Sequence, residues 1–264
     1  MYNTANKVFT VFLYLACVHA GSLLHAEVAL SPMGGQQGSE FETEVIGEGF
    51  DGAHSVVFDC DLLQGEVRTE INDDETRVFI RVKIDPTAKP GAHVCRILTA
   101  HGLSEPLILQ VNTEPSAKES EKPHTKPGMA QQVEYPGVVN GVIKEAGEVD
   151  FYAFEVDAGQ EIMFEVITPT GLIFQGKSRS PDMMNDAELA LYKAGESWFG
   201  SGRPNRIEPT DETLVYYFPA RFPGYSMPIH IPRLRYRFDE AGWYLLEVGN
   251  VRHHGGPTFN YQLR

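Results

Sequence analysis

Two cysteines, Cys60 and Cys95, are the residues of this chain best suited to chemistry. A cysteine becomes a nucleophile when a histidine activates its thiol, and the sequence offers His54 and His93 as partners for Cys60. In an oxidising compartment, a disulfide between the two cysteines is the stronger expectation. Closing a loop of this length would stabilise the fold by roughly 3–4 kcal/mol on the chain-entropy account. We therefore expect a Cys60–Cys95 disulfide, with two buried free thiols as the alternative.

Other catalytic patterns are missing from the sequence. It contains no Gly-x-Ser-x-Gly turn for a nucleophilic serine, no phosphate-binding glycine-rich loop and no His-Glu-x-x-His zinc helix. Each of these chemistries depends on its residues at that spacing, because the fold must bring the reacting groups together. We expect a protein without catalytic activity.

Metal ligation is a second chemistry that the sequence permits. His253 and His254 would face opposite ways in a strand, and they could share an ion only in a turn. Calcium needs six to eight oxygen ligands. The carboxylates at short spacing are Asp59, Asp61, Asp73 and Asp74, with Glu148 and Asp150 at the start of a strand. Solvated or turn-stabilising carboxylates are the main expectation; we expect no cofactor, with calcium as the alternative.

Residues 195–232 are rich in aromatic and basic side chains. Exposed aromatic rings beside polar groups suit sugar rings or a protein partner. The alternative is that these rings pack over a sheet edge as part of the core. The candidate ligand surface consists of Trp198, Phe199, Tyr216, Phe222 and Tyr225, with Arg203 and Arg221.

The first 26 residues have the pattern of a signal peptide. Lys7 is their only charged side chain, an apolar run follows, and the small residue Ala26 ends the stretch. We expect cleavage after Ala26 and export to the periplasm or the medium. A lipid-modified Cys17 and a retained anchor are the alternatives, although the apolar run is well short of the ~20 residues that a span needs.

The charge of the chain limits its partners. Its 22 basic and 36 acidic residues give a formal net charge of −14, and the acidic residues are spread along the sequence. Such a surface repels phosphate backbones and anionic lipid, so we expect no nucleic-acid partner. We interpret this charge as a contribution to solubility, with affinity for divalent cations as the alternative.

Short alternating strands must position all of these residues. Val78, Ile80, Val82 and Ile84 share one face of a strand that follows a hairpin turn at 72–75. Residues 114–132 contain three prolines and no aromatic residue, so they predict a semi-extended linker. We expect an all-β protein of two β-sandwich domains, immunoglobulin-like over 27–113 and jelly-roll-like over 133–264.

The second half resembles a known family. The phrase GVIKEAGEVDFYAFEVDAGQEIMFEV at 141–166, AELALY at 187–192 and DEAGWYLLEVGNVRHHGGPTFNYQLR at 239–264 are similar to the bacterial pre-peptidase C-terminal domain. Residues 28–111 more weakly resemble an immunoglobulin-like (IPT/TIG-like) module. Glu148 stands where the family often has Asp, and residues 195–232 replace its usual acidic, glycine-rich turn.

The resemblance implies a β-sandwich that accompanies secreted enzymes, often peptidases, and has no activity of its own. We therefore expect an exported, non-catalytic binding or accessory protein that recognises a polymer (a polysaccharide or a protein) or a partner protein. A structural spacer in an envelope assembly is one alternative. A detached accessory portion of a secreted peptidase is another.

Overall fold

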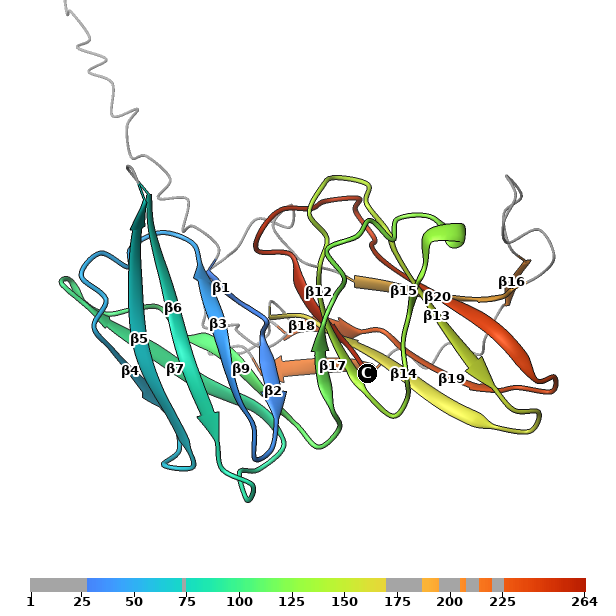
Figure 1. Ribbon diagram of the computed structural model, residues 1–264, viewed down its shortest axis with the longest axis horizontal. Helices are drawn as coiled ribbons and strands as arrows, with labels where there is room; N and C mark the ends of the chain where they lie inside the picture. Colours follow the sequence, from blue (N-terminus) through green and yellow to red (C-terminus); the bar gives the residue numbers. More distant parts are fainter. Residues whose placement is uncertain (1–27, 73–74, 170–186, 195–204, 208–213, 220–225) are drawn as a thin grey trace, which may run out of the picture.

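The protein is built almost entirely of β-strands, which confirms the all-β sandwich prediction. A computed structural model describes residues 28–72, 75–169, 187–194, 205–207, 214–219 and 226–264. Two sandwiches lie side by side in Figure 1, the first in blue to green and the second in green to red. The expected signal peptide lies outside the described residues. Within the described part of the chain, no helix has the length and hydropathy of a membrane span.

The first sandwich consists of two sheets in which most neighbouring strands are antiparallel. One sheet has the order β1-β3-β6-β5, and the other has the order β2-β9-β7-β4 with β8 paired to β7. The strand bounds are β1 Ala29–Ser31, β2 Gly34–Gln36, β3 Glu40–Ile46, β4 Ser55–Phe58, β5 Leu63–Asn72, β6 Glu75–Ile84, β7 Gly91–Thr99, β8 Gly102–Leu103 and β9 Leu107–Asn112.

The β5–β6 hairpin follows directly from the sequence pattern. The register of the two strands continues to the pair Asn72 and Glu75, where the turn was predicted. On β6, the alternating residues Val78, Ile80, Val82 and Ile84 are at most 2% exposed. Their shared face packs in the core of the first sandwich, because successive side chains of a strand point to opposite sides.

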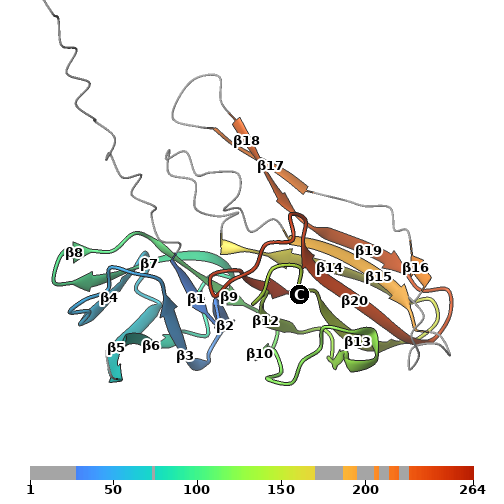
Figure 2. The same ribbon diagram turned by 90° about the horizontal axis from the view of Figure 1, so that it is seen from above.

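The second sandwich also has two sheets, with the orders β10-β12-β21-β14-β19 and β11-β13-β20-β15-β16. Its strands are β10 Ser116–Lys118, β11 Gln131–Gln132, β12 Val138–Val142, β13 Asp150–Val156, β14 Glu161–Ile167, β15 Ala187–Lys193, β16 Asn205–Ile207, β19 Arg233–Arg237, β20 Gly242–Asn250 and β21 Asn260–Leu263. A short 3-10 helix, η1, covers Pro127–Met129. The hairpin of β17 (Leu214–Pro219) and β18 (Ser226–Ile231) projects from this sandwich in Figure 2.

The described residues form two separate cores, which meet at the junction of the two sandwiches. Aromatic residues such as Tyr152, Phe154 and Phe238 fill the second core and are at most 1% exposed. At the junction, Ile167 of β14 packs against the first core. The amide of Asn260 donates a 3.0 Å hydrogen bond to the carbonyl oxygen of Leu30 across the same junction.

The prediction of a linker over residues 114–132 is wrong. β10 pairs in parallel with β12, and β11 pairs in parallel with β13, so both ends of the segment belong to sheets of the second sandwich. Between them, the carbonyl oxygen of His124 accepts a 2.8 Å hydrogen bond from the amide of Phe151. Backbone pairing and buried polar groups hold the segment in place, so it is ordered although it has few apolar side chains.

Candidate functional site

A cleft of about 500 Å³ opens into the second sandwich beside the end of β21. It lies between β14 and the segment 133–137 that leads into β12. Its volume is in the range of small-ligand pockets. The apolar lining comes from core side chains of both sheets: Val139, Phe154, Phe164, Leu246 and Leu263. These five residues are at most 7% exposed, so the cleft reaches the edge of the hydrophobic core.

Tyr135 and Met163 form part of the cleft wall. The Tyr135 hydroxyl lies 2.7 Å from the carbonyl oxygen of Glu155 and 2.8 Å from Gln160 Oε1. Its ring meets that of Phe154 edge-on, with the centroids 6.1 Å apart. These contacts fix the tyrosine ring at the wall. The Met163 side chain is 53% exposed, so an occupant of the cleft could contact it.

Glycine is required at position 137, where the chain turns into β12. A Cβ atom there would lie 2.8 Å from the carbonyl oxygen of Glu134, which is closer than a real side chain can approach. Near this tight turn, Tyr135 packs against Phe154 of β13 and hydrogen-bonds to Gln160, just before β14. Local sequence and distant strands thus build the cleft wall together.

Charged residues surround the apolar floor. The buried Glu165 carboxylate accepts hydrogen bonds from Arg264 Nε at 2.6 Å and Arg233 Nε at 3.2 Å. Glu161 forms an ion pair with Arg235 on the neighbouring strand β19. Because Glu165 is paired on both oxygens, it holds the two arginines at the cleft wall. An occupant would meet apolar surface in the centre and charge around it.

The backbone of β14 also faces the cleft. Glu165 and Arg264 exchange two backbone hydrogen bonds of 2.7 and 2.9 Å on the β21 side of the strand. Backbone polar groups alternate in direction along a strand, so the amide and carbonyl of Met163 point to the same side as those of Glu165. This side is where the cleft lies. An extended chain in the cleft could therefore hydrogen-bond to β14.

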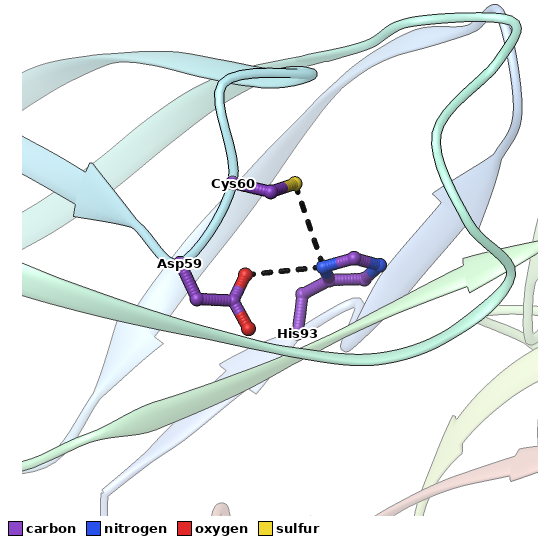
Figure 3. Close-up of side chains that lie close together, drawn as sticks. All are labelled: Asp59, Cys60 and His93. Carbon is purple, nitrogen blue, oxygen red and sulfur yellow. Dashed lines mark hydrogen bonds and ion pairs between the residues drawn. The ribbon is translucent and has the colours of Figure 1, made fainter.

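Asp59, Cys60 and His93 form a separate cluster in the first sandwich (Figure 3). His93 Nδ1 lies 3.1 Å from Asp59 Oδ1 and 3.6 Å from Cys60 Sγ. His93 Nε2 lies 2.7 Å from the carbonyl oxygen of Lys89. In a thiol–imidazole–carboxylate relay, the thiol and the carboxylate use different ring nitrogens. Here both approach Nδ1, which is not that arrangement.

The prediction of a Cys60–Cys95 disulfide is wrong in this structure, where both cysteines are free thiols. The register of β4 and β7 pairs Phe58 with Cys95. Cys60 lies two residues further along and comes beside His93 instead. Cys95 is 1% exposed in the first core, and burial raises its pKa to about 12, with a smaller contribution from the charge of Asp59.

Most of the predicted ligand surface lies outside the described residues. Tyr216 lies in β17, opposite Ile229 of β18. The other six residues of the predicted surface lie outside the described residues: Trp198, Phe199, Arg203, Arg221, Phe222 and Tyr225. The proposed role of this surface stays a prediction.

The other predicted ligands have different outcomes. Glu148 stabilises a turn, because its Oε2 accepts hydrogen bonds from the amides of Lys144 at 2.6 Å and Glu145 at 2.8 Å. His253 lies in a turn with a φ of 57°, and the His254 ring packs edge-on against Phe259. Asp61 is exposed, and Asp73 and Asp74 lie outside the described residues. Sequence reasoning missed the cleft, since its walls come from strands far apart in the chain.

Comparison with known proteins gives no close relative. No family model matches the chain, and no curated protein sequence matches it. Among solved structures, the Bacteroides ovatus mixed-linkage glucan utilization protein SGBP-B, in complex with a mixed-linkage heptasaccharide, is 8% identical; the match covers 82% of this chain and 72% of that one, with a TM-score of 0.28.

Two further structures overlap with the chain. The Yersinia pseudotuberculosis adhesin InvE is 9% identical, with 87% of this chain and 52% of that chain covered and a TM-score of 0.24. A chimeric titin Z1Z2 carrying a decorin peptide is 11% identical, with 83% and 85% covered and a TM-score of 0.19. At TM-scores this low, the superpositions establish neither shared ancestry nor shared function.

Proposed function

We propose that this is an exported, non-catalytic binding protein whose second sandwich holds an extended segment of a partner protein in its cleft. The partner strand would lie along β14 and place an apolar side chain on the cleft floor. Backbone hydrogen bonds supply affinity in such strand addition, and pockets for alternate side chains supply specificity.

The open hydrophobic cleft beside a strand edge is the observation that carries this proposal. The floor residues Phe154 and Phe164 belong to the core, yet the cleft of about 500 Å³ reaches them. The Met163 backbone groups face the same opening, which favours a peptide over a ligand without a backbone. The net charge of −14 supports a protein partner over nucleic acid.

Export rests on the signal-peptide pattern of the first 26 residues, and the accessory role rests on the resemblance of residues 133–264 to the pre-peptidase C-terminal domain. A polysaccharide is the alternative ligand, and the test below separates it from a peptide.

The test is binding of a random-peptide display library and of a glycan array to the chain from Glu27 onward. The critical variant is Met163→Arg, which places a long charged side chain at the cleft wall. Val57→Arg is the matched control, because Val57 is also 53% exposed but lies on β4 of the first sandwich.

The proposal expects the library to enrich peptides with alternating apolar residues. Their affinity should fall at least about tenfold in Met163→Arg, as for a lost interface anchor, and stay unchanged in Val57→Arg. Enriched peptides that bind the Met163→Arg protein equally well would refute the cleft as the site. Binding to glycans alone would refute a peptide ligand.

A further inference from the structure

Three side chains that could ligate a metal ion meet at the edge of the second sandwich, and two of them come from the segment that the sequence predicts to be a linker. Glu119 and His124 come from the segment between β10 and β11, and Asp150 begins β13. The amide of Glu119 is bound to the carbonyl oxygen of Asn140 at 2.8 Å, and the carbonyl oxygen of His124 is bound to the amide of Phe151. Backbone pairing therefore fixes where all three side chains start.

The tautomer of His124 follows from its surroundings. Its Nδ1 lies 3.1 Å from the carbonyl oxygen of Lys122, which can only accept a hydrogen bond, so Nδ1 carries a proton. In the neutral ring, Nε2 then presents a lone pair. Nε2 lies 3.4 Å from Asp150 Oδ1 and 3.9 Å from Glu119 Oε2.

Two of these three atoms are buried without a hydrogen-bond partner in the described part of the chain, whereas Glu119 Oε2 accepts a 3.1 Å hydrogen bond from the amide of Val142. The side chains of His124 and Asp150 are 4% and 1% exposed, and that of Glu119 is 11% exposed. Among the described residues, neither His124 Nε2 nor Asp150 Oδ1 has a hydrogen-bond partner. Buried polar atoms without partners are costly, so such atoms facing one another indicate a missing ligand.

The second carboxylate oxygens of Asp150 and Glu119 are also bound to neighbouring side chains. Asp150 Oδ2 accepts a 2.7 Å hydrogen bond from the Tyr261 hydroxyl, which lies 2.5 Å from the Tyr152 hydroxyl. Lys144 Nζ lies 2.5 Å from Glu119 Oε1. Metal ligands in proteins are oriented in this way by hydrogen bonds to their remaining polar atoms.

We propose that Glu119, His124 and Asp150 form a zinc site. One imidazole nitrogen and two carboxylate oxygens suit Zn²⁺, whereas calcium takes six to eight oxygens. Bond lengths of about 2.0–2.2 Å in a tetrahedron place neighbouring ligand atoms roughly 3.4 Å apart. The observed 3.4 and 3.9 Å from Nε2 fit that spacing with small movements.

The three side chains fill three positions of the tetrahedron and leave the fourth to a water molecule. The ion acts structurally because its ligands come from two separate segments of the chain. Zinc at this position joins the segment carrying Glu119 and His124 to the first residue of β13. A site that forms only in the folded chain converts binding energy into folding energy. The ion therefore fastens residues 119–124 to the second sandwich.

The test measures zinc on the full chain from Glu27 onward, by titration calorimetry with ZnSO₄ and by metal analysis after dialysis. The variant is His124→Gln, and Glu119→Gln is the second variant in case the first fails to fold, since Glu119 is less deeply buried. His93→Gln is the matched control, because Asp59, Cys60 and His93 are the other cluster of metal-ligand type in the described residues.

The proposal expects one zinc ion per chain in the wild type and in His93→Gln, and a loss of affinity of at least about tenfold in His124→Gln and Glu119→Gln. Zinc should also raise the melting temperature, and a chelator should reverse that rise. With Co²⁺ in place of zinc, no thiolate charge-transfer band should appear. No zinc binding, or zinc lost in His93→Gln alone, would overturn the proposal.

Discussion

The two thiols of the chain from Glu27 onward should differ sharply in reactivity. The chain from Glu27 onward contains Cys60 and Cys95 as its only cysteines. Cys60 is half-buried, whereas Cys95 lies in the first core and burial raises its pKa from 9.0 to about 12. Only the thiolate reacts with a disulfide reagent.

The magnitude follows from these pKa values. At about pH 8, an ordinary thiol with a pKa of 9.0 is about one-tenth thiolate, and one with a pKa of about 12 is about one part in ten thousand thiolate. Cys95 should therefore react about 1000-fold more slowly than an ordinary thiol in the folded protein. In urea, both thiols should react at ordinary rates.

The assay is the time course of labelling by a chromogenic disulfide reagent, with and without urea and without any reductant. The variant Cys60→Ala isolates Cys95: it should show no fast phase when folded and one thiol when unfolded. Finding no free thiol in the unfolded, unreduced wild type would restore the disulfide. Fast labelling of Cys95 in the folded variant would refute its burial.

Two further predictions concern the buried polar cluster, both measured by urea unfolding of protein stripped of metal with a chelator. Burial, opposed by a hydrogen bond from Tyr261, raises the pKa of Asp150 from 3.8 to about 6. The protonated Asp150 contributes to the free energy of unfolding below about pH 4, and this contribution is lost as the pH rises to about 6. The free energy of unfolding of Asp150→Asn should therefore rise by about 3 kcal/mol relative to that of the wild type over this range. A difference between the two proteins that does not change with pH would contradict this. Tyr261→Phe should cost about 1–3 kcal/mol, and more than Tyr152→Phe, because it leaves both Asp150 and Tyr152 without their partner; equal losses would contradict the direction of these hydrogen bonds.

The strands were predictable because each carries its own periodic signal. On β6, Val78, Ile80, Val82 and Ile84 recur at every second position, so the buried face could be identified without knowing its neighbours. The hairpin at Asn72 and Glu75 was also a local signal, since a turn sequence separates two alternating runs. The all-β class follows from many such local decisions.

The segment 114–132 shows where local reasoning fails. Its composition predicted a linker, but Ser116 pairs with Val138 and Gln131 with Tyr152 through backbone groups that every residue carries. The burial of His124 depends on Asp150 and Phe151, which lie 26 and 27 residues further along the chain and outside the segment whose composition was considered. Parallel pairing with a later strand leaves no periodic mark in the short segment itself.

The candidate sites were hidden for the same reason. The sequence offered His93 as a partner of Cys60, but only the register of β4 and β7 decides between His93 and Cys95. The cleft depends on where β21 ends relative to β14, and this is set by the pairing of β21 with both β12 and β14. The resemblance of residues 133–264 to the pre-peptidase C-terminal domain stays a prediction.

The most direct test of the proposed function is a nuclear magnetic resonance titration of isotope-labelled chain with the peptide that the display library enriches. The account predicts saturable shifts of the amide signals of Tyr135, Val139 and Met163, which line the cleft. Shifts confined to the first sandwich, or to the β17–β18 hairpin, would contradict a partner strand on β14.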